Sequence, residues 1–202
     1  MTTPEFFDAA QTADRAAAII EAFDPGMQGG RAIAELLTGV IGPSGRLPIS
    51  LPRHAGQLPV NYNSVRGQHG ESYADLTQEP LFAFGDGLSY TTVEYCDLRL
   101  EQTELSLDNE MRATITATNT GTRTALETVQ VYIVDRVTSV TWTNSELKAF
   151  AQTTIPPGGR VDIELVIPVA ACTRVVERGH FDLHVEPTSS EADLLSAGFV
   201  VS

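Results

Sequence analysis

The sequence predicts a mainly β fold, in which a β-sandwich follows a shorter segment with helical patterns. From residue 93 onward, apolar and polar residues alternate in short segments, such as 113–118, 129–133, 161–167 and 180–185. Helix-like patterns occur only before residue 40. About seven strands within about 110 residues, without a helix signal, are typical of a β-sandwich.

The composition and net charge of the chain disfavour some classes of partner and indicate a cellular location. The 202 residues suffice for one large or two small domains. A net charge of −13 disfavours nucleic acid and anionic membranes as partners. The chain has no apolar run of the ~18 residues expected of a membrane helix, and its N-terminus lacks a signal-peptide pattern. Cys96 and Cys172 are isolated and are predicted to be buried free thiols, which favours a cytoplasmic location.

Residues 1–60 carry two helical patterns and one extended run. The first pattern covers 14–23 and ends at the Asp-Pro-Gly of 24–26; its apolar face comprises Ala16, Ile19, Ile20 and Phe23. The second covers about Gly29 to Leu37, with Gly39 as a C-terminal cap and an inward face formed by Ile33, Leu36 and Leu37. Residues 47–51 form an edge strand at most, because prolines lie on both sides.

Residues 80–95 (PLFAFGDGLSYTTVEY) form the junction between the two parts. Gly85 and Gly87 flank Asp86, so the backbone there can reach conformations closed to other residues. Four aromatic side chains surround this turn and can anchor it: Phe82, Phe84, Tyr90 and Tyr95. Before it, residues 53–80 show little periodicity and are predicted to be a connector that packs on a neighbour or serves a site.

Three segments carry a resemblance to a known family. They are DPGMQGGRAIAELL at 24–37, PSGRLPISLP at 43–52 and the junction at 80–95. In this order they resemble glycoside hydrolase family 3, the β-glucosidase-like enzymes. Segments at 119–121, 127–132 and 146–150 are similar to the fibronectin type III-like C-terminal domain of that family. Arg178 replaces a usual proline and 170–176 is shortened, which predicts irregular pairing of the last strands.

The resemblance implies a domain division. Residues 1–60 would be the C-terminal remnant of an α/β sandwich domain, 61–92 the connector and hinge, and 93–202 the fibronectin type III-like domain. The family connector drapes over the α/β domain, so residues 53–80 are expected to be mobile without it. The sandwich is expected to buttress the α/β domain and, through this connector, to shape the rim of the substrate cleft.

The resemblance assigns no catalytic residue to this chain. Retaining glycoside hydrolysis needs a nucleophilic carboxylate and a second acid/base carboxyl group. The family segments that carry them have no counterpart here, and no cofactor or metal ligand is assigned either. The carboxylates nearest the family motifs are expected to cap backbone amides, to stabilise turns or to face solvent: Asp24, Glu35, Glu71 and Asp86.

Other polar residues have two interpretations each. His180, Asp182 and His184 share one strand face and could bind Zn²⁺, although a solvent face is the simpler interpretation. Trp142, in a predicted loop, could stack on a sugar ring, although packing at an interface is favoured. Arg46 and Arg53 could meet a sugar or carboxylate, and pairing with acidic neighbours across the domain interface is favoured.

Three functions remain open. The favoured one is the C-terminal part of a β-glucosidase-type glycoside hydrolase, inactive alone, whose partners are upstream catalytic domains or a chain that supplies them. Its ligand would be a β-glycoside or oligosaccharide, and its unpaired apolar helix faces predict self-association. The alternatives are a stand-alone carbohydrate- or protein-binding module and an independent small hydrolase.

Overall fold

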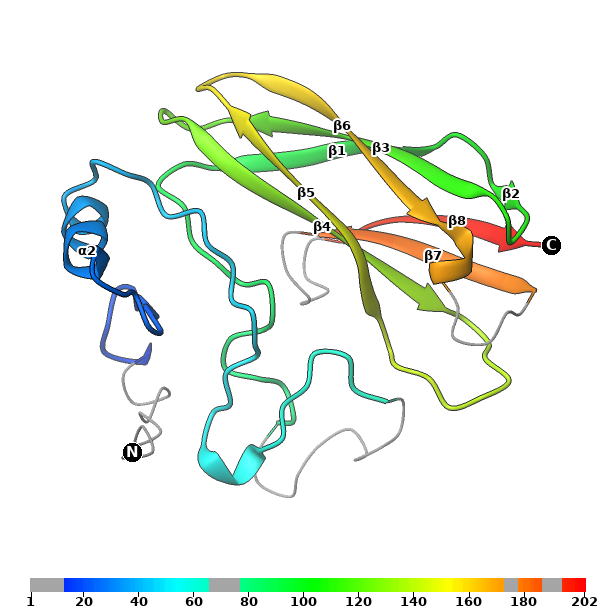
Figure 1. Ribbon diagram of the computed structural model, residues 1–202, viewed down its shortest axis with the longest axis horizontal. Coiled ribbons are helices and arrows are strands. Elements are labelled where there is room, and N and C mark those ends of the chain that lie inside the picture. Colours follow the sequence, from blue (N-terminus) through cyan, green and yellow to red (C-terminus); the bar gives the residue numbers. More distant parts are fainter. Residues whose placement is uncertain (1–12, 66–76, 173–177, 187–193) are drawn as a thin grey trace.

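Two antiparallel-rich sheets pack face to face in the computed structural model, which describes residues 13–65, 77–172, 178–186 and 194–202 (Figure 1). The first sheet has the order β1-β3-β6, with bounds Val93–Leu100, Glu110–Asn119 and Arg160–Pro168. The second has the order β2-β8-β7-β4-β5, with bounds Glu104–Leu105, Leu195–Val201, Gly179–Glu186, Ala125–Asp135 and Glu146–Ile155. The predicted β-sandwich is confirmed.

The core lies between the sheets and follows the alternation of the sequence. On β3, Ala113, Ile115 and Ala117 are buried, and on β7 the same holds for every second residue, Phe181, Leu183 and Val185. Phe181 stacks on Phe199 of β8 with ring centroids 5.4 Å apart. Burying these apolar side chains supplies the main driving force for the fold.

Strand pairing is regular where irregularity was predicted. β7 pairs with β8 in one unbroken register from Gly179 to Val185, and with β4 from Phe181 to Glu186. That prediction is wrong for the described residues because the inward alternation of β7 is intact. The register shifts lie elsewhere, between Cys96 and Arg99 of β1 and between Val131 and Tyr132 of β4.

Among the described residues of the N-terminal segment, one of the two predicted helices forms. Helix α2 (Gly29–Leu37) forms as predicted, and Gly39 follows it with φ +73°. Leu37 is 68% exposed, however, and does not point inward as expected. Residues 16–23 are not helical, which corrects the helix predicted there. Short helices are marginal in water without an apolar surface to pack on, and Ile20 and Phe23 remain exposed.

The described chain also contains two single-turn 3₁₀ helices and two free cysteines. The 3₁₀ helices are η1 (Ala55–Gln57) and η2 (Val169–Ala171). Both cysteines are free, as predicted; Cys172 is buried and Cys96 is half-buried. Among the described helices, none has the length and apolar character to cross a membrane.

Asn119 fastens the end of β3 to three neighbouring segments. Its buried side chain donates to the carbonyl oxygens of Arg123 (2.7 Å) and Ile155 (2.9 Å), and accepts from Thr91 Oγ1 (2.7 Å) and the amide of Gly121 (3.1 Å). We predict that Asn119→Ala lowers the free energy of unfolding by about 2–3 kcal/mol, because buried groups lose their partners. Chemical denaturation measures this change. Thr114→Ala on the same strand is the control, and an equal loss in both variants would contradict the assignment.

The Cys172 thiol is protected by its surroundings. Burial raises its pKa to about 11, with a smaller opposing effect from Lys148. Since the thiolate is the reactive species, the native chain at pH 8 is predicted to leave Cys172 unmodified by iodoacetamide. Peptide mass spectrometry after labelling measures this, and labelling in denaturant is the control. Rapid labelling of native Cys172 would contradict its buried placement.

Candidate functional site

The glycine-framed turn at Gly85–Gly87 joins the N-terminal segment to the sandwich. The Gly85 amide donates to the Leu47 carbonyl, and the Leu47 amide donates to the Asp86 carbonyl, both at 2.8 Å. Leu51 forms a bridge with Phe82 further along. Asp86 Oδ2 accepts from the Ala83 amide at 2.7 Å, so the turn-capping role predicted for Asp86 is confirmed.

This turn lies against the outer face of β4. Gly85 has φ +86°, and a Cβ atom there would come within 2.7 Å of Gln130 Nε2. Phe84 stacks on Tyr62 with centroids 4.3 Å apart, and Tyr62 meets Tyr132 edge-on at 6.3 Å. Gln130 and Tyr132 are consequently buried, although alternation alone would place them towards solvent.

A buried carboxylate lies at the centre of the junction. Glu127 of β4 is 5% exposed and shares the inward parity of Val129. Its Oε1 accepts hydrogen bonds from the Arg46 guanidinium at 2.7 Å and from the Tyr95 hydroxyl of β1 at 2.6 Å. Arg46 also donates to the Gly87 carbonyl at 2.9 Å. The acidic partner predicted for Arg46 is therefore confirmed.

The environment of Tyr95 keeps its hydroxyl protonated. Burial is the main cause that raises the pKa of Tyr95 well above its ordinary value, and the nearby Glu127 carboxylate adds to it. The hydroxyl thus acts as a hydrogen-bond donor to Glu127 over the whole physiological pH range. With Arg46 as counter-charge, this arrangement neutralises and satisfies the carboxylate, which suits a structural role.

The C-terminal end of α2 is held by two side chains. The Tyr90 hydroxyl donates to the Leu36 carbonyl at 2.9 Å, and Arg123 donates to the Gly39 carbonyl. The Arg123 guanidinium lies 5.5 Å from the centroid of the Tyr90 ring. Helix ends leave carbonyls without intrahelical partners, and a cation there also complements the helix dipole. The β3–β4 turn, which carries Arg123, thereby reaches the helix.

Hydrogen bonds join the two described ends of the connector. Buried Gln57 donates from Nε2 to the carbonyls of 77, 78 and 79, at 3.4, 3.0 and 2.9 Å. Arg53 donates to the carbonyls of Glu79 (3.2 Å) and Pro80 (3.4 Å), which corrects the carboxylate partner expected for it: the chain reversal places carbonyls within its reach. Val65 bridges to Thr143 of the β4–β5 loop. The mobility expected for 53–80 stays a prediction; within this range, residues 66–76, including Glu71, lie outside the described residues.

The remaining sequence candidates do not converge on one centre. Asp24 is exposed, and Glu35 pairs with Arg31 at 2.6 Å. Asp182 binds Arg136 through two contacts of 2.5 and 2.6 Å, which lowers the pKa of its carboxyl group. Within the described ranges, no group of three His, Cys, Asp or Glu side chains could hold a metal ion.

Trp142 lies in the β4–β5 loop, as predicted, and is half-buried. The Lys148 ammonium lies 5.8 Å from the centroid of the Trp142 ring. A cation over the ring occupies a face that a stacking sugar would use. This placement agrees with packing better than with sugar binding.

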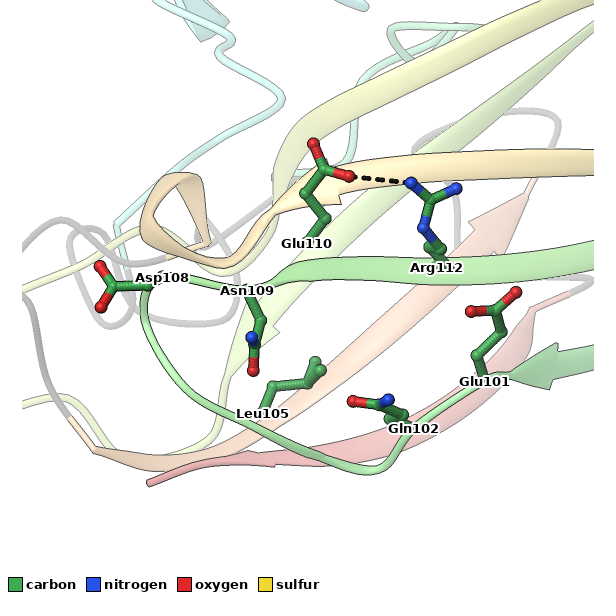
Figure 2. Close-up of a pocket in the computed structure, with 7 residues that line it drawn as sticks. All are labelled: Glu101, Gln102, Leu105, Asp108, Asn109, Glu110 and Arg112. Carbon is green, nitrogen blue, oxygen red and sulfur yellow. Dashed lines mark hydrogen bonds and ion pairs between the residues drawn. The ribbon is translucent and has the colours of Figure 1, made fainter.

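A shallow polar cavity that the sequence did not suggest has a volume of about 290 Å³. Figure 2 shows the residues that line it. It lies near β2, at the opposite end of the sandwich from α2 in Figure 1. Arg112 reaches Glu110 and Glu164 at 2.9 Å each, so its charge is already compensated. A second cavity of about 270 Å³ lies beside Arg136 and Phe199. A single stretch, 101–112, lines the first cavity, whereas segments distant in sequence line the second, and no motif marks either of them.

Comparison with known families places both parts of the chain. The model described as "Glycosyl hydrolase family 3 C-terminal domain" matches residues 2–90, and the fibronectin type III-like domain matches residues 127–190. A periplasmic β-glucosidase of Salmonella typhimurium is 36% identical over 78% of this chain. A β-xylosidase of Formosa agariphila is 34% identical over 94% of it. The chain spans only 22% and 28% of these two relatives.

Solved structures agree with this placement. A β-glucosidase of intestinal bacteria involved in saponin metabolism is 48% identical, with a TM-score of 0.85 over 89% of this chain and 25% of that protein. A β-glucosidase of Listeria innocua in complex with glucose is 29% identical, with a TM-score of 0.88 over 97% of this chain and 29% of that protein. The chain therefore belongs to glycoside hydrolase family 3 and corresponds to the C-terminal portion of its β-glucosidase-like members.

Proposed function

We propose that this chain is the structural C-terminal part of a β-glucosidase-type glycoside hydrolase and supports hydrolysis only together with the upstream part of the family fold. The family carries the nucleophile and the acid/base group in segments that have no counterpart in this sequence. The contribution of this chain is then to hold the end of the α/β domain in place. A β-glycoside or oligosaccharide would be the substrate of the assembled enzyme.

The observation that carries this proposal is the contrast between the two sides of the N-terminal segment. One side is attached to the sandwich and the hinge through the Arg46–Glu127 ion pair and the hydrogen bonds that Tyr90 and Arg123 donate to the end of α2. Large apolar side chains nevertheless remain exposed along this segment and the hinge: Met27 (101%), Leu37 (68%), Val40 (70%), Ile49 (51%) and Leu88 (70%). Soluble proteins rarely expose so many apolar groups together unless another surface covers them.

The proposed cover is the portion of the α/β domain that lies upstream of this segment in the family fold. Helix α2 stands away from both sheets in Figure 1, joined to them by the extended chain. Such a helix gains most of its stability from packing of an apolar face. The stand-alone binding module is less well supported, since Trp142 already has Lys148 over its ring. The cytoplasmic location stays a prediction.

Complementation tests the proposal. The upstream part of a family 3 β-glucosidase, ending where the match to this chain begins, is expressed with and without the chain, and hydrolysis of an aryl β-glucoside is measured. Activity is expected only when both parts are present. Activity of the chain alone would favour an independent hydrolase, and the absence of any complex would contradict the proposed role.

Matched variants locate the contact. Leu37→Lys together with Val40→Lys is expected to abolish complementation, because charges in an apolar interface lose their hydration. Val137→Lys alters an apolar residue that is 82% exposed in the β4–β5 loop and is expected to complement normally. Equal effects of both changes would indicate non-specific damage instead of a specific interface.

A further inference from the structure

The edge strand β5 differs from the other strand edges of the sandwich. It ends the five-stranded sheet and, within the described part of the chain, forms a ladder only with β4. An unpaired edge presents backbone N–H and C=O groups that can accept another strand. Natural proteins usually protect such edges with charges, bulges or short length.

The other edges carry these protections. β1 has a register shift after Cys96 and exposes the charged Glu94, Asp97 and Arg99. β6 exposes the charged residues Arg160, Asp162 and Glu164. β2 is only two residues long. Each of these edges is therefore poorly suited to pairing with a second chain.

β5 lacks such protection over most of its length. Its charged residues, Glu146 and Lys148, lie at its beginning and pair with each other at 3.0 Å. The bulge opposite Val131 and Tyr132 is also at this end. From Ala149 to Ile155 the sequence AFAQTTI contains neither charge nor proline. Phe150 in the middle of the strand is 70% exposed.

We propose that β5 is a self-association edge, at which a second copy of this chain pairs antiparallel about a two-fold axis beside Phe150. Antiparallel pairing of identical strands is self-complementary, as a two-fold interface requires. With Phe150 opposite its symmetry mate, Lys148 faces Gln152 and Glu146 faces Thr154, so like charges do not meet. The two Phe150 rings then lie side by side as a cross-strand aromatic pair.

Charge restricts where a second copy can approach, and β5 meets that restriction. The chain carries a net charge of −13, so two copies repel each other over most of their surfaces. The uncharged run of β5 is a place where they can approach without opposing charges. Two five-stranded sheets would then join into one continuous sheet.

Analytical ultracentrifugation over a range of protein concentrations tests the proposal. The unaltered chain is expected to form a dimer, and Phe150→Lys is expected to be a monomer at concentrations where the parent is dimeric. Val166→Lys alters an apolar residue that is 40% exposed on β6 and should leave the dimer intact. Thermal melts monitored by circular dichroism verify that each variant is folded.

Two further measurements separate β5 from other contacts. Hydrogen exchange of residues 149–155 is expected to slow as the protein concentration rises, because edge amides become bonded. Leu37→Lys with Val40→Lys distinguishes the apolar N-terminal surface. The proposal is overturned by a monomeric parent, by a dimer that persists in Phe150→Lys, by loss of the dimer in the Leu37/Val40 variant, or by β5 exchange that is independent of concentration.

Discussion

The structure depends on one buried charge, the Glu127 carboxylate at the inward side of β4. A carboxylate without partners in such a place would strongly oppose folding. Tyr95 supplies a hydrogen bond from within the sandwich, but the compensating positive charge comes from Arg46, 81 residues earlier in the chain. The sandwich is thus electrostatically incomplete without the segment that precedes it.

The contacts on the outer face of β4 show the same dependence of the sandwich on the chain that precedes it. Gly85 allows the hinge to approach Gln130 closely, and Phe84 and Tyr62 seal the face around Tyr132. Hinge, connector end and sandwich therefore pack as one unit. The N-terminal segment is attached to this unit and exposes apolar residues to solvent. This arrangement is expected of a support for an adjoining domain.

Local pattern predicted much of the fold and less of the junction. The sandwich follows from period-two alternation, and the bounds of α2 follow from the preceding Asp-Pro-Gly and the following Gly39. The helix expected at 14–23 was wrong because propensity does not supply a packing surface. Glu127 carried a detectable signal, since a carboxylate interrupts the inward series of Ala125, Val129 and Val131. Its partner Arg46 and the buried state of Gln130 come from long-range contacts that no local pattern contains.

A double-mutant cycle between Arg46 and Glu127 tests the central claim most directly. The free energies of unfolding of Arg46→Met, Glu127→Gln and the double variant are compared with that of the parent. Because each single change leaves the other group without its partner in a buried site, we expect a coupling energy of about 2–3 kcal/mol. Additive effects, with coupling below about 0.5 kcal/mol, would show that the two groups act independently and would contradict this account of the junction.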